Sequence, residues 1–157
     1  MERKKVKDLV IPISDYPHLP YWGTLKEAII QLSVAYETGH HTVLVFDESY
    51  KLVGMLLERD VLRGLEPKFA QHYEDGVSIL WDELLDSGLE KQLDRPIKEC
   101  MSAVNAKVDA EDTVLKASHI MVHDNVYLLP VMDGDKLIGV IRMGDVFQEI
   151  TGTILET

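Results

Sequence analysis

The apolar positions of this 157-residue chain follow one pattern, and the pattern occurs twice. In each copy a threonine precedes apolar residues at helical spacing, and two short apolar runs and a second helical stretch follow. Thr24 and Thr113 are expected to cap the N-termini of their helices with the side-chain oxygen. Gly39 is expected to end the first of these helices, and Asp124-Asn125 the second. The residues at helical spacing are Leu25, Ala28, Ile29 and Leu32 in the first copy, and Val114, Ala117, Ile120 and Met121 in the second.

The two apolar runs of each copy are predicted to form a β-hairpin. They are residues 42–46 and 52–57 in the first copy, and 126–132 and 137–141 in the second. Asp133-Gly134-Asp135 joins the second pair, and glycine tolerates the positive φ that tight turns need. Each hairpin leads into a helix that begins near Asp60 or Asp145. With an extended lead-in before the threonine, the predicted order in each copy is strand, helix, strand, strand, helix.

The second strand of each hairpin carries the closest match between the copies. Gly54 and Asp60 in the first copy correspond to Gly139 and Asp145 in the second, in the same register. Two copies are too few for a solenoid, in which at least three repeats are expected. The pattern therefore predicts two similar subdomains that pack as a pair, with any ligand site duplicated.

One segment, residues 66–95, lies outside the repeat. It separates a first copy expected over residues 5–65 from a second expected over 96–151. The segment is acidic, which is typical of a solvated face. It also contains apolar residues at helical spacing, which predict a helix that either packs on its own subunit or forms a partner or dimer surface. These residues are Val77, Leu80, Trp81, Leu84 and Leu85.

The net charge, the apolar runs and the cysteine count limit the kinds of partner and location that we expect for the chain. The net charge of -11 argues against a nucleic-acid backbone as ligand, because phosphates need a basic face. No apolar run approaches the roughly 18 residues that a membrane span requires, and no signal-peptide apolar region follows the basic N-terminus. Cys100 is the single cysteine, so we expect no intrachain disulfide and a cytoplasmic location. It is expected to be a small apolar filler, with a reactive thiol as the alternative.

The motif Gly-apolar-apolar-x-x-x-Asp-apolar closes both hairpins, at residues 54–61 and 139–146. In this tandem order it resembles a pair of cystathionine β-synthase-type (CBS) domains, the Bateman module. The resemblance runs from about residue 5 to 151, apart from the insertion. It implies an α/β fold in which two β-α-β-β-α repeats pack about a pseudo-twofold axis and leave two related clefts. In many family members these clefts bind AMP, ADP, ATP or S-adenosylmethionine.

The resemblance also implies that Asp60 and Asp145 hold the ribose hydroxyls of such a ligand. A carboxylate can accept both hydrogens of a vicinal diol, and a helix start brings backbone N–H groups near a phosphate. A plain helix N-cap is the alternative for each aspartate. Where the family usually has Ser or Thr, this chain has Leu57, which offers no hydrogen bond, and Arg142. Arg142 is expected either to bind a phosphate or to pair with Asp145 and keep an empty cleft closed, and Arg59 is a second candidate phosphate partner.

In the family, an adenine-binding wall comes from the lead-in and the first hairpin strand, as backbone and apolar side chains. Tyr21-Trp22 could stack on the base or belong to the core. The residues that correspond to this wall are Val104, Asn105, Ala106, Leu129, Pro130 and Val131 in the second copy, and Leu19, Pro20, Tyr21, Val43 and Leu44 in the first.

The resemblance implies a non-catalytic sensor of an adenosine nucleotide that signals by a conformational change to an unidentified effector protein. We expect a homodimer, and no cofactor apart from the nucleotide as a regulatory ligand. The alternative is a ligand-free dimerisation or protein-interaction module, which the substitutions at Leu57 and Arg142 favour. A third interpretation is a metal-responsive module that uses His119 and His123, although the sequence shows no third ligand nearby. Exposed helix-face histidines are the simpler explanation for that pair.

Overall fold

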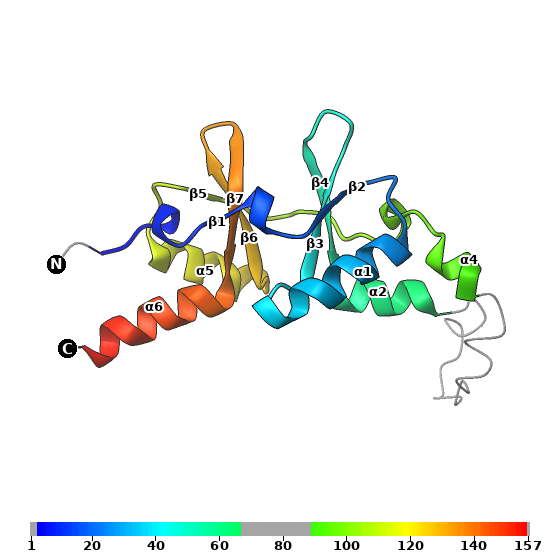
Figure 1. Cartoon of the computed structure of the whole chain (residues 1–157). Coiled ribbons are helices and arrows are strands. Elements are labelled where there is room, and N and C mark those ends of the chain that lie inside the picture. The colour runs from blue at the N-terminus through cyan, green and yellow to red at the C-terminus, as the bar shows by residue number, and fades with distance from the viewer. Residues whose placement is uncertain (1–2, 67–88, 157) are drawn as a thin grey trace. The chain divides into compact units, whose positions relative to one another are not determined.

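The chain is divided into two compact units, which we treat separately. The computed structural model describes residues 3–66 and 89–156, and the apolar residues predicted to form a helix between positions 77 and 85 lie outside them. The first unit comprises residues 17–104, and the second comprises residues 1–16 together with 105–157 (Figure 1). Each unit contains its own sheet and its own helices.

The first unit is built on a three-stranded sheet in the order β2-β3-β4. Strand β2 runs parallel to β3, and β3 and β4 form the predicted antiparallel hairpin. Its strands are β2 (His18–Pro20), β3 (Thr42–Phe46) and β4 (Leu52–Leu57), and its helices are α1 (Leu25–Ala35), α2 (Glu58–Leu65) and α4 (Leu89–Leu93). Short 3-10 helices lie at Tyr36–Thr38 and Ile97–Glu99.

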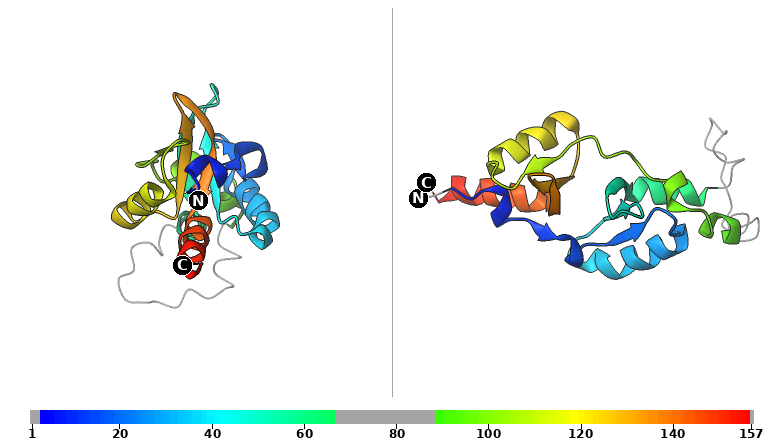
Figure 2. Two further views of the ribbon diagram at one scale, coloured as in Figure 1. Left: turned by 90° about the vertical axis from the view of Figure 1, so that its left-hand side faces the viewer. Right: turned by 90° about the horizontal axis from the view of Figure 1, so that it is seen from above.

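The second unit has a four-stranded sheet in the order β1-β7-β6-β5. Strand β5 runs parallel to β6, and β6 and β7 form the second predicted hairpin. Its strands are β1 (Ile11–Pro12), β5 (Val108–Asp109), β6 (Leu128–Asp133) and β7 (Lys136–Arg142), and its helices are α5 (Val114–Asp124) and α6 (Met143–Leu155). Short 3-10 helices lie at Val6–Asp8 and Ile13–Asp15. The N-terminal segment and the end of α6 lie at the same end of this unit (Figure 2).

The helix boundaries follow the predicted capping residues, with one correction. Thr24 Oγ1 accepts a hydrogen bond from the Glu27 N–H at 3.2 Å, and Thr113 Oγ1 accepts one from Lys116 at 3.1 Å. Asn125 ends α5 in the left-handed conformation with φ of 53°, as predicted. Gly39 ends the first helical segment in the left-handed conformation with φ of 81°, as predicted, and the correction is that α1 itself stops at Ala35 and the last turn, Tyr36–Thr38, is a 3-10 helix.

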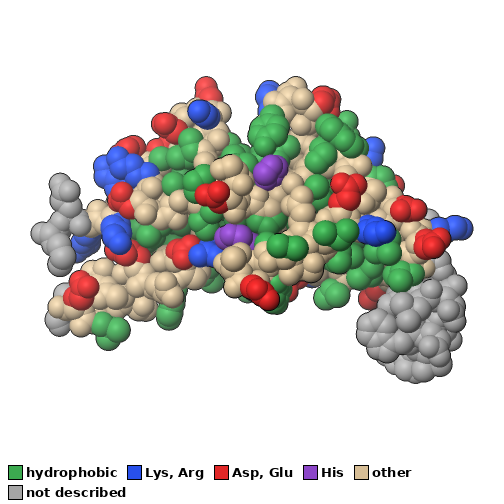
Figure 3. Space-filling model, viewed as in Figure 1, with side chains coloured by type: hydrophobic (Ala, Val, Ile, Leu, Met, Phe, Trp, Pro, Cys, Tyr) green, Lys and Arg blue, Asp and Glu red, His purple; other side chains and the backbone are tan. Residues whose placement is uncertain are grey.

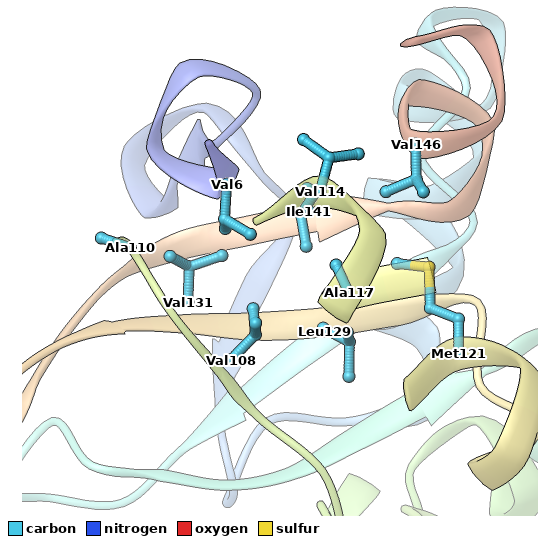
Figure 4. Close-up of a cluster of buried hydrophobic side chains, with 10 residues drawn as sticks. All are labelled: Val6, Val108, Ala110, Val114, Ala117, Met121, Leu129, Val131, Ile141 and Val146. Carbon is cyan, nitrogen blue, oxygen red and sulfur yellow. The ribbon is translucent and has the colours of Figure 1, made fainter. Parts of the chain in front are cut away.

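Each unit has a hydrophobic core between one face of its sheet and its helices. In the second unit, alternate residues of β6 and β7 face α5 and α6, as strand geometry requires. Figure 4 shows this core, to which the N-terminal segment contributes the fully buried Val6. In the first unit the core is formed by Leu19, Leu25, Ala28, Leu32, Val43, Val45, Leu56, Val61, Ile97 and Cys100.

The lead-in segments are exchanged between the sequence repeats. The N-terminal lead-in belongs to the second unit, where Ile11 pairs with Val140 across β1 and β7. The lead-in of the second copy belongs to the first unit, where Ser102 forms an isolated antiparallel bridge with Met55. The compact units and the sequence repeats thus differ at their ends, and the repeat boundaries at residues 5–65, 66–95 and 96–151 stay a prediction.

The motif glycines permit this close approach of the lead-in segments. A Cβ on Gly139 would collide with the backbone carbonyl of Ile11. A Cβ on Gly54 would meet Met101 Sδ at 2.5 Å and the carbonyl oxygen of Ser102 at 3.1 Å. A side chain at either position would therefore force the lead-in away from the sheet.

The N-terminal segment is also held by charge. Lys5 Nζ and Lys7 Nζ each donate to the Glu111 carboxylate, at 2.8 and 2.9 Å. These two ammonium groups lower the pKa of Glu111 to about 2, mainly through hydrogen bonds to its ionised form.

Candidate functional site

Asp60 and Asp145 occupy equivalent places, each in the first turn of the helix that follows its hairpin. The sequence predicts both positions correctly. Their surroundings differ, however, and this difference decides what each carboxylate can bind.

The carboxylate of Asp60 is completely buried and is surrounded by donors from its own unit. It accepts a hydrogen bond from the Leu57 backbone N–H at 2.9 Å. The Ser102 hydroxyl lies 2.9 and 3.1 Å from its two oxygens. Arg63, one turn further along α2, completes the set with an ion pair to the same carboxylate. With 0% of its side chain exposed, Asp60 is a structural residue that connects α2 to Ser102 in the lead-in of the second copy.

The carboxylate of Asp145 is partly accessible and is held by a single arginine fork. Arg142 Nε donates to Asp145 Oδ2 at 2.8 Å, and Arg142 Nη2 donates to Asp145 Oδ1 at 3.0 Å. The exposed fraction of the side chain is 23% for Asp145 and 28% for Arg142. The hydrogen bond to Asp145 raises the pKa of the Arg142 guanidinium. Of the two alternatives left open for Arg142, the structure contains the ion pair with Asp145.

The first turn of α6 is open next to this pair. A Cβ built on Gly144 meets no atom of the described residues within 4 Å. Free N–H groups at a helix start favour anions, and each oxygen of a carboxylate has lone pairs for more than one donor. The Arg142–Asp145 pair therefore still presents acceptors, a positive charge and a helix N-terminus together.

Three substitutions between the copies account for the difference. Leu57 stands where the second copy has Arg142, so only the second copy has a cation three residues before its aspartate. Arg63 stands where the second copy has Gln148, so only the first copy has a cation one turn later. The third difference lies in the exchanged lead-ins, where Ser102 and Ile11 pair with equivalent strand positions. The side chain of Ile11 cannot donate a hydrogen bond to Asp145, whereas the Ser102 hydroxyl donates one to Asp60.

Arg63 and Ser102 are the partners that sequence reasoning missed. Arg63 follows Asp60 at a helical spacing of three residues, so the pair could have been read from the sequence. Ser102 lies far from Asp60 in the sequence, and no local pattern connects the two.

The predicted adenine wall is divided between core and surface. Val43, Leu129 and Val131 are fully buried in the helix-facing cores of their units, so only their backbone atoms could face a ligand. Pro130 is buried on the opposite face of the β6 strand, because successive side chains alternate. The remaining wall residues of the second copy precede β5 without regular structure: Val104 and Ala106 are half-buried and Asn105 is exposed.

Tyr21 and Arg59, two further predicted ligand contacts of the first copy, differ in burial. Tyr21 is half-buried, packs against the core of the first unit and contacts Trp22 edge to face, with ring centroids 5.2 Å apart. Arg59 is exposed on the first turn of α2. The predicted roles of these residues in ligand binding stay predictions.

Cys100 and the pair His119 and His123 are the other candidate reactive groups. Cys100 is buried in the core of the first unit, as predicted for a small apolar filler, and burial raises the pKa of its thiol. His119 and His123 lie side by side on α5, with ring centroids 4.0 Å apart. Within residues 3–66 and 89–156, no group of three or more His, Cys, Asp or Glu side chains could hold a metal ion. None of the helices described in these ranges is long and apolar enough to cross a membrane.

Comparison with protein-family models gives a match over residues 97–152, to the CBS domain. The chain carries a CBS domain. The match covers the second sequence copy, in which Gly139 and Asp145 form the motif, and it confirms the resemblance inferred from the sequence. No curated protein matches the chain.

Solved CBS-domain structures share the fold of nearly the whole chain at low sequence identity. The CBS-pair protein CBSX2 from Arabidopsis thaliana is 19% identical, with a TM-score of 0.70 and coverage of 99% of each chain. A structure of CBSX2 in complex with AMP is 19% identical, with a TM-score of 0.66 and coverage of 98% of each chain. A CBS-domain-containing membrane protein from Sphaerobacter thermophilus is 20% identical over 93% of this chain and 87% of its own, with a TM-score of 0.68. The fold is therefore the α/β fold of a tandem CBS pair, as predicted.

Proposed function

We propose that this CBS pair is a non-catalytic regulatory module that binds an adenosine nucleotide next to Asp145. The observation that carries the proposal is the contrast between the two aspartates. Asp60 is buried and surrounded by donors of its own unit, whereas Asp145 is partly accessible and lies beside Arg142. The chain would therefore have one nucleotide site, at the Asp145 carboxylate of the second repeat.

The groups at Asp145 match the parts of a nucleotide. The carboxylate oxygens accept hydrogen bonds from the ribose diol, as an acidic residue does in dinucleotide-binding folds. The Arg142 guanidinium and the N-terminus of α6 favour the phosphate. Arg142 also orients Asp145 through its two hydrogen bonds, so the carboxylate is positioned before the ligand arrives.

AMP is the first ligand to test, because the CBSX2 structure that shares this fold contains it. ADP, ATP and S-adenosylmethionine are the other candidates. Binding changes the populations of conformations that differ in affinity for the ligand, and a partner protein that contacts only one of them is thereby regulated.

A thermal-shift screen with these four compounds tests the proposal. A ligand present at about 100 times its dissociation constant adds about 2.7 kcal/mol to the free energy of unfolding. For a chain of this size, each kcal/mol raises the melting temperature by about 2–4 °C, so we expect a rise of about 5–11 °C. GMP serves as the matched control for the base. A flat response to millimolar concentrations of all four compounds would contradict nucleotide sensing.

A second candidate function, a ligand-free dimerisation or interaction module, rests on a different observation. Both helices of the second unit expose large apolar side chains seven residues apart, and therefore on one side of each helix. They are Leu115 and Val122 on α5, and Phe147 and Ile154 on α6. We propose that these side chains form a homodimer contact, with or without nucleotide. Light scattering should then report twice the monomer mass of 17.8 kDa.

A further inference from the structure

The first unit contains a pocket that the proposed nucleotide site does not use. It lies where β2 meets the turn between β3 and β4, and its volume is about 370 Å³. Four rings and two carboxylates line it: His18, Trp22, Phe46, Tyr50, Asp47 and Glu48. We call this site the hairpin pocket. Figure 3 shows hydrophobic side chains along the β3–β4 hairpin.

The rings of the hairpin pocket are arranged as a connected wall. Phe46 and Tyr50 stack with ring centroids 4.8 Å apart. His18 meets Phe46 edge to face at 6.0 Å and Tyr50 at 6.4 Å. Trp22 adds a ring that is mostly exposed. The pocket is thus lined by four rings, of which His18, Phe46 and Tyr50 contact one another.

The turn holds this wall in place. Asp47 Oδ1 accepts hydrogen bonds from the backbone N–H groups of Ser49 and Lys51, both at 2.9 Å. Tyr50 has the left-handed backbone conformation with φ of 61°, which is unusual for a bulky residue and common for glycine. An aromatic ring at this strained position is therefore kept against Phe46 at a conformational cost.

The charge of the hairpin pocket is negative. Asp47 and Glu48 contribute carboxylates to its lining. Glu48 also accepts a hydrogen bond from Tyr21, and this negative neighbour raises the pKa of the Tyr21 hydroxyl.

The hairpin pocket and Asp60 lie at opposite ends of strand β3. Thr42 at one end pairs with Leu57, which precedes the Asp60 helix, whereas Phe46 at the other end pairs with Pro20 in the pocket. Four residue steps of strand, about 13 Å, separate these ends. The pocket is therefore distinct from the motif aspartate of its own unit.

We propose that the hairpin pocket binds a small organic cation with a methylated ammonium head group. Aromatic faces attract such cations through the ring quadrupole, and methylated ammonium groups prefer aromatic cages because they are weakly hydrated. The two carboxylates add Coulomb attraction and exclude anions such as nucleotide phosphates. A volume of about 370 Å³ suits a ligand at the small end of the usual range of roughly 300–1,000 Å³.

The test is a titration of the full chain with tetramethylammonium chloride, followed by two-dimensional NMR at constant ionic strength. Concentrations up to about 50 mM cover weak millimolar sites. We expect saturable shifts of the Trp22 indole N–H and of the backbone amides of residues 46–50. tert-Butanol has a similar shape and no charge, and it should bind at least about threefold more weakly. No saturable shift, or equal binding of tert-butanol, would overturn the proposal.

Three variants localise the effect. Glu48→Gln should weaken tetramethylammonium binding by about threefold or more, because it removes one charge from the lining. Asp135→Asn removes a charge from the equivalent turn of the second unit and should leave binding unchanged. Tyr50→Gly removes a ring but suits the left-handed backbone, so the fold should be kept while binding is lost. Wild-type binding by the folded Tyr50→Gly variant would overturn the proposal as well.

Discussion

Replacing Asp60 by alanine should destabilise the protein far more than the same change at Asp145. Asp60 is 0% exposed and accepts hydrogen bonds from the Leu57 N–H and the Ser102 hydroxyl. Each hydrogen bond to a buried charge contributes about 1.5–3 kcal/mol. Arg63 adds little, because its side chain is 59% exposed and solvent screens the pair.

The alanine variant also relieves the cost of burying the carboxylate, so the net loss is smaller than the sum of the bonds. We expect a fall of about 2–4 kcal/mol in the free energy of unfolding, within the range for broken buried networks. The melting temperature should drop by about 4–16 °C. Asp145 forms a partly exposed ion pair, and its alanine variant should lose only about 0–1 kcal/mol.

Urea denaturation of the two variants, followed by circular dichroism, measures this difference. Ser102→Ala provides the test of mechanism through a double-mutant cycle with Asp60→Ala. If the serine acts through the carboxylate, its removal should cost about 1–3 kcal/mol in the wild type and much less beside Asp60→Ala. Equal stabilities of Asp60→Ala and Asp145→Ala, or strict additivity in the cycle, would refute the reasoning.

Three further predictions concern the sheet, the N-terminal segment and the assembly. Gly139→Ala should lower the melting temperature by about 2–12 °C because its Cβ collides with the Ile11 carbonyl, whereas Gly144→Ala, in a helix with open space, should be neutral or stabilising. The pKa of Glu111 is lowered from 4.5 to about 2 by its two lysines, so their pairing stabilises the fold fully above pH 4.5 and is lost as the pH falls towards 2. Glu111→Gln should therefore lower the urea midpoint at pH 7, and the difference in midpoint from the wild type should disappear below pH 3. A difference in midpoint that does not change with pH would contradict the stabilising role of the Glu111 carboxylate. Phe147→Glu should convert the proposed homodimer into a monomer in light scattering, and a wild type that already runs as a monomer would rule the dimer out.

The sequence was sufficient for the helices and hairpins of the two copies and for the positions of the two aspartates. Thr24 and Thr113 identify their helices because capping acts within three residues, and the short apolar runs identify the hairpins for the same local reason. The exchange of the lead-in segments was not predictable in this way. Pairing of Ile11 with Val140 is a contact between distant parts of the chain, and the repeat pattern alone assigns each lead-in to its own copy.

The sequence predicted the positions of Asp60, Asp145 and Arg142, and it distinguished the two copies by Arg142 and Leu57, but it did not predict the burial of Asp60. The ion pair of Arg142 with Asp145 follows from a spacing of three residues, and the sequence had left it as one of two alternatives. The burial of Asp60 depends on Ser102, whose approach comes from tertiary packing. Strand alternation separates Leu129 and Val131 from Pro130, so a run of neighbouring residues in the predicted wall cannot all point the same way.

Isothermal titration calorimetry of wild type and Asp145→Ala, with the nucleotide that performs best among AMP, ADP, ATP and S-adenosylmethionine, tests the central claim most directly. We predict saturable binding to the wild type and at least a tenfold loss of affinity in Asp145→Ala, equivalent to about 1.4 kcal/mol. The modest effect of Asp145→Ala on stability keeps the comparison free of unfolding. Absence of binding to the wild type, or equal affinity in the variant, would contradict a nucleotide site at Asp145.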